Sequence, residues 1–312
     1  MAALLSPLGA LYGLSVRSRL HRARPFRPKA RVVCVGNLTA GGSGKTPVAI
    51  ALGNALTARG KKIIFLSRGY GGRLHGPVEV DPAQHSASDV DDEPLLLASH
   101  GAVIVARNRA DGARLADSLG ADIILMDDGF QNFQIAKDLS LVVVDAQSGF
   151  KNGRLIPAGP LREVVAHGLA RADAIVLMGE GMPSLPSFAG PILCARIVPT
   201  APDTLRGRSV LAFAGIERPQ KFFQTLRFMG AEIVAAQSFP DHHKFTATEL
   251  SVLKLAAEKA NALLVTTEKD FVRLELAPRD SIAAVPVHAV FAEAAALEAL
   301  LDRLIQERDV GV

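Results

Sequence analysis

The segment "GNLTAGGSGKTPVAIAL", residues 36–52, contains the residue types that a phosphate-binding loop uses. The usual loop is G-x-x-x-x-G-K-[ST], whose glycines let backbone N–H groups approach a polyphosphate. Thr39 stands at the first position here, whereas Gly44, Lys45 and Thr46 match the end of the pattern. The lysine of such a loop contacts the outer phosphates, and the hydroxyl binds Mg²⁺. The sequence therefore predicts that a polyphosphate binds Thr39, Ala40, Gly41, Gly42, Ser43, Gly44, Lys45 and Thr46.

The residues around this loop predict a strand before it and a helix after it. An apolar run, "RVVCVG", occupies residues 31–36, and residues 47–60 have helical spacing and a terminal glycine. A phosphate would then lie at a helix N-terminus, where unpaired N–H groups and the helix dipole favour negative charge. A glycine-rich turn without a ligand is the alternative. The G-K-T sequence in a strand–helix context favours phosphate binding.

A second group of chemically useful residues follows another apolar run. In "DIILMDDGFQN", Asp127 and Asp128 come directly after a predicted buried strand. Because parallel strands end at the same sheet edge, we expect both carboxylates beside Lys45. One would hold Mg²⁺ directly or through water, and the other would orient the metal or a ligand. An acidic turn without a metal is the alternative.

Further polar residues lie in predicted loops at this edge. Asp91, Asp92 and Glu93 precede an apolar helix expected to start at Pro94, where helix capping alone would explain them. Four other side chains would suit an anionic sugar, although exposed arginines are also often merely solvated. These are Arg68 and Tyr70 in "SRGYGGR" and Arg107 and Arg109 in "ARNR".

The order of apolar runs predicts an α/β fold with two domains. Continuous Val/Ile/Leu runs at 62–66, 102–106, 122–126, 139–146 and 174–178 indicate a parallel sheet with helices on both faces. We therefore expect a P-loop NTPase-like domain at 31–190 and an extended linker at 191–208. A smaller α/β domain at 209–312 would face the first across a cleft.

Composition excludes several classes of protein. Two cysteines in 312 residues support neither a disulfide framework nor a cysteine zinc site. The net charge of +4 comes from seven Lys/Arg residues within residues 1–31, and the remaining chain has 28 bases against 31 acids. We therefore expect no nucleic-acid partner.

The N-terminal arm, residues 1–30, combines an apolar start with a basic end. About 16 apolar residues are too few to span a bilayer, which needs roughly 20. Ser6 and Pro7 predict a helix start, and Leu4, Leu8 and Leu11 recur at helical spacing, as do Leu5, Leu8 and Tyr12. This pattern fits an interfacial anchor on anionic lipid. A helix docked on the protein's own core is the alternative.

Eight segments together resemble the tetraacyldisaccharide 4′-kinases of lipid A biosynthesis. They occur in the family's order over residues 5–275, and the loop with Thr39 is itself the family's form. The segments are "GNLTAGGSGKTP", "SRGYGG", "DDEP", "DDGFQN", "DLSLVVVDA", "GRLIPAGPLRE", "FPDHHKF" and "TTEKDFVRL".

The resemblance implies an ATP- and Mg²⁺-dependent kinase that phosphorylates the 4′-hydroxyl of a tetraacylated glucosamine disaccharide 1-phosphate. It places the enzyme at the cytoplasmic face of the bacterial inner membrane, and no protein partner is inferred. By resemblance, Asp92 is the catalytic aspartate, Glu93 lies near the metal and His242 supports Asp92. Glu163 matches the acid of the family's P-L-R-E motif. Three residues depart from the family pattern, namely Asp91 for Gly, Asn132 for His and Val164 for Pro.

Two other P-loop classes do not fit. A GTPase needs [NT]-K-x-D, but Lys269 and Asp270 are adjacent in "TTEKD". A partitioning ATPase has an extra lysine where this loop has Ala40. A membrane-associated ATPase or nucleotide-binding adaptor without a lipid acceptor stays open as the alternative function.

Overall fold

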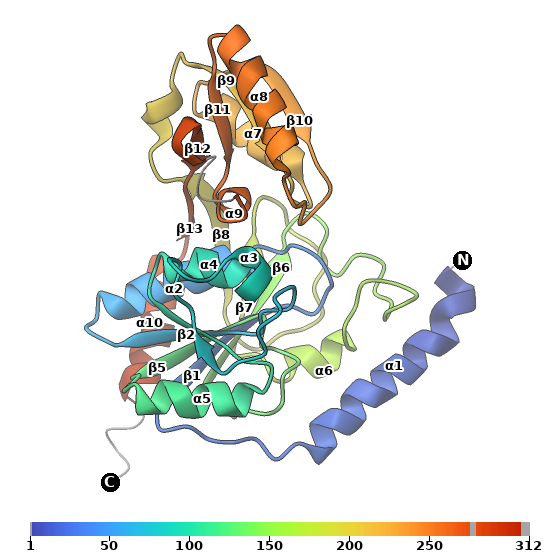
Figure 1. Ribbon diagram of the computed structural model, residues 1–312. Coiled ribbons are helices and arrows are strands. Elements are labelled where there is room, and N and C mark those ends of the chain that lie inside the picture. Colours follow the sequence, from blue (N-terminus) through green and yellow to red (C-terminus); the bar gives the residue numbers. More distant parts are fainter. Residues whose placement is uncertain (1, 275–278, 307–312) are drawn as a thin grey trace.

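The first unit of the chain is a nine-stranded sheet with the order β13-β8-β7-β6-β1-β5-β2-β4-β3. The computed structural model describes residues 2–274 and 279–306 (Figure 1). Neighbouring strands are parallel except for β3 and β13, which pair antiparallel at the two edges. The strands are β1 (Arg31–Gly36), β2 (Ile63–Ser67), β3 (Val78–Glu79), β4 (Ala102–Val105), β5 (Ile123–Asp127), β6 (Leu139–Asp145), β7 (Ala174–Met178), β8 (Ile192–Pro199) and β13 (Val287–Phe291).

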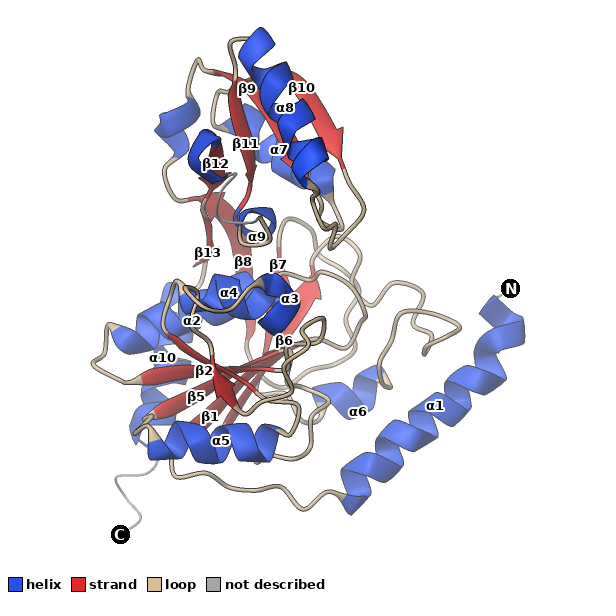
Figure 2. Cartoon of the chain, viewed as in Figure 1, coloured by secondary structure: helices blue, strands red, loops and turns tan. Residues whose placement is uncertain are grey.

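Helices cover both faces of this sheet, as Figure 2 shows. Alternate residues of β1 enter opposite cores, because successive side chains of a strand point to opposite faces. Val33 and Val35 pack with α2, α4 and α10, whereas Val32 and Cys34 pack with α5 and α6. The predicted parallel sheet between two helical layers is therefore confirmed. The helices are α2 (Lys45–Thr57), α3 (Ala87–Val90), α4 (Asp92–Ala98), α5 (Arg109–Ser118), α6 (Val165–Leu169) and α10 (Ala294–Gln306).

The second unit is smaller and has a four-stranded parallel sheet with the order β10-β9-β11-β12. Val210 and Ala212 of β9 pack with α7, and Leu211 and Phe213 pack with α8. The elements are β9 (Ser209–Ala214), α7 (Pro219–Phe228), β10 (Glu232–Ser238), α8 (Ala247–Lys259), β11 (Leu263–Thr267), α9 (Glu268–Phe271) and β12 (Ile282–Val285), with 3₁₀ turns η1 (Pro202–Leu205) and η2 (Arg279–Ser281).

The predicted domain boundaries need correction. Residues 191–208, expected to be a linker, include β8, which pairs with β7 and β13 and buries Leu193 and Ala195 in the first core. The expected C-terminal domain, 209–312, also divides, since β13 and α10 pack on the first sheet through an apolar helix stripe. The second unit is thus inserted between β8 and β13. Residues 1, 275–278 and 307–312, which those predictions included, lie outside the described residues.

Helix α1 (Ala2–Arg22) forms the N-terminal arm and stands beside the first unit (Figure 1). The helix does not start at Pro7 as expected but includes it. A Cβ on Gly13 would lie 2.7 Å from a methyl of Leu155, and Val16 is buried, so one face of α1 rests on the protein. The opposite leucines are exposed, at 84% for Leu4 and 62% for Leu11. Within the described residues, no helix combines the length and apolarity needed to cross a membrane.

Candidate active site

The phosphate-binding loop, residues 39–46, is held in position by hydrogen bonds to neighbouring residues. Ala40 N donates to Pro160 O at 2.7 Å, and the Asn37 side chain spans the loop by donating to Ser43 Oγ at 3.1 Å. Gly44 has a φ of 84°, a left-handed conformation that glycine adopts without strain. Its absent side chain also leaves room for Met178, because a Cβ there would lie 2.9 Å from Met178 Cγ. The loop therefore requires glycine at this position for two separate reasons.

Thr46, Asp127 and Asp128 lie at one sheet edge with Lys45, as the sequence predicts. The register pairs Val35 of β1 with Asp127 of β5, so both strands end at this edge. Thr46 Oγ1 donates to Asp127 Oδ2 at 2.9 Å, and Lys45 Nζ lies 4.0 Å from Asp128 Oδ1. Arg162 Nη1 also donates to Asp128, at 2.7 Å. The four predicted residues thus form one polar cluster beneath the loop.

The two aspartates differ in their electrostatic state. Burial raises the pKa of Asp127 to about 7, and the nearby charge of Glu93 adds to the effect. Burial also opposes ionisation of Asp128, but the charges of Lys45 and Arg162 outweigh it and lower its pKa. Asp127 Oδ1 is buried and has no hydrogen-bond partner among the described residues. Asp127 therefore has an unsatisfied oxygen, whereas Asp128 is already paired.

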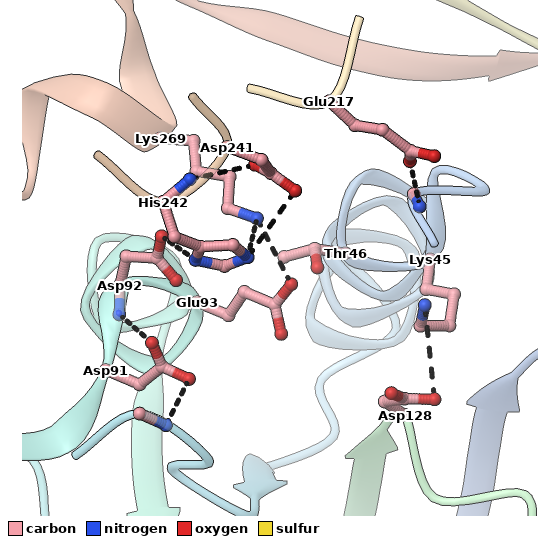
Figure 3. A network of polar contacts seen from close by, with 12 residues as sticks. Lys45, Thr46, Asp91, Asp92, Glu93, Asp128, Glu217, Asp241, His242 and Lys269 are labelled. Carbon is pink, nitrogen blue, oxygen red and sulfur yellow. Dashed lines mark hydrogen bonds and ion pairs between the residues drawn. The ribbon is translucent and has the colours of Figure 1, made fainter. Parts of the chain in front are cut away.

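This donor set fits Mg²⁺. Magnesium prefers oxygen ligands and is usually bound by one or two carboxylates together with phosphate oxygens. Thr46 Oγ1, the unpaired Asp127 Oδ1 and the Glu93 carboxylate supply such oxygens, and Figure 3 shows Glu93 extending from α4 toward Thr46 on α2. A cation would also offset the burial cost of the Asp127 charge. These residues, with Asp128 beside them, could hold the ion.

Asp91, Asp92 and Glu93 begin α4, which starts at Asp92 and not at Pro94 as expected. Asp91 is the N-cap, with a φ of 80°, and its carboxylate accepts from Asp92 N at 2.9 Å and Gly71 N at 3.2 Å. The cap thus ties the "SRGYGG" loop to the start of α4. It also fixes where the next two carboxylates point.

Asp92 meets His242 where the two units are in contact (Figure 3). His242 Nδ1 lies 3.1 Å from Asp92 Oδ2, and Lys269 Nζ lies 3.5 Å from Glu93 Oε1. Burial opposes ionisation of Asp92, but the His242 hydrogen bond and the charges of Lys269 and Arg273 hold its pKa well below its usual range. The bond to Asp92 raises the pKa of His242. The pair that the resemblance implies is therefore assembled across the junction.

A carboxylate of the second unit contacts the phosphate-binding loop. Glu217 accepts a hydrogen bond from Gly42 N, as Figure 3 shows. The next residue, Arg218, donates to Asp145 at 2.7 Å, and Lys221 lies 3.4 Å from the same carboxylate. The start of α7 is thus fixed against the phosphate-binding loop and the end of β6. No sequence pattern predicts this contact between distant segments.

The predicted sugar-binding side chains separate into exposed and buried groups. Arg68, Tyr70 and Arg107 are exposed, and the Arg68 guanidinium lies 5.6 Å from the Tyr70 ring centre. Arg109 is buried, and its Nη1 donates to Ala106 O at 2.5 Å. Burial, followed by the Arg68 charge, lowers the pKa of Arg109 to about 10. Only the first three present their side chains at the surface, so the expectation for Arg109 needs correction.

Glu163 is a second correction, because its carboxylate is already occupied. It is 3% exposed and accepts from Arg171 Nη1 at 2.8 Å and Nη2 at 2.9 Å. Gln131 donates to it at 3.0 Å and also to Asn37 O. A buried acid with these partners supports the segment before the phosphate-binding loop and is not presented to a substrate. Its neighbour Arg162 instead reaches Asp128.

Sequence reasoning did not assign Arg162, Lys269 or Arg273 to the site. Lys269 and Arg273 are four residues apart in "TTEKDFVRL". This segment contributes to the family resemblance, but the resemblance assigned no role to either residue. This spacing places them on one side of a helical turn, which was an available signal. Arg162 directly precedes Glu163 in "GPLRE", and no local pattern indicates that its side chain reaches Asp128.

Comparisons with known proteins identify one family. The family model described as tetraacyldisaccharide-1-P 4′-kinase matches residues 1–306. The tetraacyldisaccharide 4′-kinase of Rhodospirillum centenum is 51% identical, over 99% of this chain and 93% of that protein. That of Paramagnetospirillum magneticum is 51% identical, over 96% of this chain and 94% of that protein.

A solved structure shares the fold over nearly the whole chain. The crystal structure of LpxK from Aquifex aeolicus in complex with ATP has a TM-score of 0.80 and 27% identity, and the match covers 97% of this chain and 99% of that one. Family model, relatives and structure lead to the same conclusion. The chain belongs to the tetraacyldisaccharide-1-phosphate 4′-kinase family.

Proposed function

We propose that this protein transfers the γ-phosphate of ATP to the 4′-hydroxyl of a tetraacylated glucosamine disaccharide 1-phosphate. The observation that carries the proposal is the placement of the Asp92–His242 pair on one side of the site, with Lys45 and Thr46 on the other (Figure 3). Phosphoryl transfer depends mainly on positioning and on stabilising negative charge. The reaction requires a base for the acceptor hydroxyl and positively charged groups that bind the phosphates.

Lys45 and the backbone N–H groups of the phosphate-binding loop hold the β- and γ-phosphates in this scheme. Lys45 is nearly buried, so its charge acts on the phosphates with little screening by water. Thr46, Asp127, Asp128 and Glu93 would hold Mg²⁺. When bound, the ion neutralises the charge that moves toward the leaving oxygen.

Asp92 accepts the proton of the 4′-hydroxyl as the new O–P bond forms. Its Oδ1 is buried and has no partner in the described part of the chain, whereas Oδ2 is bonded to His242. An aspartate is a weak base alone, and a neighbouring imidazole can orient it and stabilise the protonated pair. The pair therefore titrates as a unit.

Helix α1 attaches the enzyme to the cytoplasmic face of the inner membrane, where a four-chained substrate resides. Leu4, Leu8, Leu11 and Leu14 are exposed, and Arg17, Arg19 and Arg22 follow them. Apolar contact and attraction to anionic lipid would act together. A cavity of about 390 Å³ lies between α1, the segment 153–161 and the start of α6, and it includes Leu155, Leu161 and Val165. Its apolar lining suits an acyl chain.

The test uses γ-labelled ATP, Mg²⁺ and the disaccharide 1-phosphate in detergent micelles. We expect label in the lipid product, and Lys45→Ala should reduce the rate at least about 100-fold because its charge stabilises the transition state. Label released only as inorganic phosphate would contradict the proposal. That result would instead favour an ATPase or nucleotide-binding adaptor without a lipid acceptor.

A further inference from the structure

Arg273 joins the two units directly beside Asp92. Its side chain is only 5% exposed. Nε donates to Asp92 Oδ2 at 2.6 Å, and Nη2 contacts the same oxygen. Nη1 donates to Gly215 O and to Asp270 Oδ1, both at 2.8 Å. One guanidinium therefore connects a carboxylate of the first unit to a carboxylate of the second.

The second unit holds Arg273 through a fixed anchor. Asp270 is completely buried, and its Oδ2 accepts from Gly215 N at 3.1 Å and from Thr267 Oγ1 at 2.7 Å. Thr267 is also the N-cap of α9, where its hydroxyl accepts from Asp270 N at 3.0 Å. Every oxygen of Asp270 is thus engaged. The planar guanidinium has little freedom to turn.

This anchor determines how Asp92 is oriented. The contacts from Arg273 and His242 all reach Oδ2 of Asp92, and Oδ1 is left buried without a partner among the described residues. Buried polar oxygens normally have a hydrogen-bond partner, so Oδ1 of Asp92 has an acceptor position that no described residue uses. Fixing one oxygen of a planar carboxylate restricts the direction of the other.

We propose that Arg273 is a positioning residue, which turns Oδ1 of Asp92 toward the acceptor hydroxyl only while the two units are in contact. The inference rests on the proposed function, because it takes Asp92 to be the base. Arg273 itself touches no substrate in this scheme. Through Arg273, the position of the second unit determines the orientation of the Asp92 carboxylate in the first unit.

A purely structural ion pair is the competing explanation. Removing one partner of a buried pair leaves the other charge uncompensated, which destabilises the fold. Arg273→Lys avoids this problem because it keeps the charge but cannot bind Asp92, Asp270 and Gly215 together. Asp270→Asn is a second variant that loosens the anchor without touching Asp92. Arg279→Lys is the matched control, since the Arg279 guanidinium donates to the carbonyls of Val272 and Leu274.

The experiment measures kcat, KM for ATP and thermal midpoint for each variant in the labelled-ATP micelle assay. For Arg273→Lys we expect kcat to fall about 10- to 100-fold, the cost of a misplaced reacting group, with KM for ATP within about threefold. Asp270→Asn should also lower kcat, and Arg279→Lys should have the kcat of the wild type. In a folded Asp92→Ala background, Arg273→Lys should slow the rate by less than about threefold, because the carboxylate it positions is absent.

Two results would overturn the inference while the proposed function stands. One is wild-type kcat in folded Arg273→Lys and Asp270→Asn. The other is losses that multiply fully in the double variant with Asp92→Ala, which would give Arg273 an independent role. If Arg273→Lys does not fold, Asp270→Asn decides alone. A wild-type protein that labels no lipid would instead contradict the proposed function, and the inference would fall with it.

Discussion

Glu217 of the second unit accepts a hydrogen bond from the backbone N–H of Gly42, inside the phosphate-binding loop. Its carboxylate lies so close that a Cβ on Gly41 or Gly42 would come within 2.9 Å or 2.8 Å of its oxygens. Backbone N–H groups of such a loop are the donors that bind nucleotide phosphates. A triphosphate bound by this loop as proposed would therefore compete with the Glu217 carboxylate for the same donor.

Removing this carboxylate should tighten ATP binding. For Glu217→Ala, we expect Kd for ATP to fall roughly three- to tenfold. The reason is that ATP no longer has to displace the Glu217 carboxylate from Gly42 N. Isothermal titration calorimetry with Mg²⁺-ATP would measure the change. Glu258→Ala is the control, since Glu258 is exposed on α8 of the same unit. Weaker binding in Glu217→Ala would mean that Glu217 contacts the nucleotide favourably.

The two aspartates at the end of β5 should respond differently to magnesium. Asp127→Asn should raise the Mg²⁺ concentration for half-maximal rate at least about tenfold, because it alters the buried oxygen that lacks a partner. Asp128→Asn should have a smaller effect on this concentration, since Asp128 is already paired with Arg162. Magnesium titrations of the initial rate decide the matter. Unchanged titrations in both variants would remove the pair from the metal site.

The ion pair between Asp145 and Arg218, which joins the two units, should make the thermal stability of the protein depend on pH. Burial opposes ionisation of Asp145, but its bonds to Ser148 and the charge of Arg218 lower its pKa from 3.8 to about 2. A depressed carboxylate pKa stabilises the folded state above the unfolded pKa, and this contribution is lost as pH falls through the folded value. We expect Asp145→Asn to unfold at a lower temperature than wild type at pH 7. The difference in unfolding temperature between wild type and Asp145→Asn should become smaller below about pH 4.

Thermal unfolding followed by circular dichroism, at a series of pH values from 7 downward, would measure this difference in unfolding temperature. Asp203→Asn is a suitable control, because Asp203 pairs with Arg206 on the exposed surface of one unit. A gap between wild type and Asp145→Asn that does not change with pH would exclude the carboxylate charge as its cause.

Membrane attachment should depend on the exposed leucines of α1. Replacing Leu8 and Leu11 with Asp should reduce sedimentation with anionic vesicles at least about tenfold, because two apolar side chains no longer enter the lipid. Both leucines are more than half exposed, so the fold should persist. Added salt should weaken binding of the intact protein through the basic residues that follow. Binding of the double variant equal to wild type would contradict this role for α1.

Local sequence patterns were sufficient to predict much of the fold and site. The phosphate-binding loop and its helix follow from glycine spacing, and the place of Asp127 follows from the apolar run before it. The start of α8 is equally local, because Thr246 and Glu249, three residues later, form its capping box. In each case the residues that determine the structure are neighbours in the chain.

The remaining features depend on contacts between distant segments. The pairing of β8 with β13 joins strands about 90 residues apart, so neither the linker nor the domain boundary could be corrected from local composition. Burial of Glu163 and Arg109 depends on which loops fold over them. The Arg273–Asp92 contact spans 181 residues and exists only after the units meet. Apolar periodicity carries no information on such pairs.

The central claim is that Asp92 and His242 act as one unit in proton removal from the acceptor. Single-turnover label transfer from saturating ATP to the micellar disaccharide tests it most directly. We expect Asp92→Ala and His242→Ala each to lose about 10²- to 10⁴-fold, with Kd for ATP within about threefold of wild type. The double variant should then be scarcely slower than Asp92→Ala alone. Losses that multiply fully, or near-normal transfer by Asp92→Ala, would contradict the account.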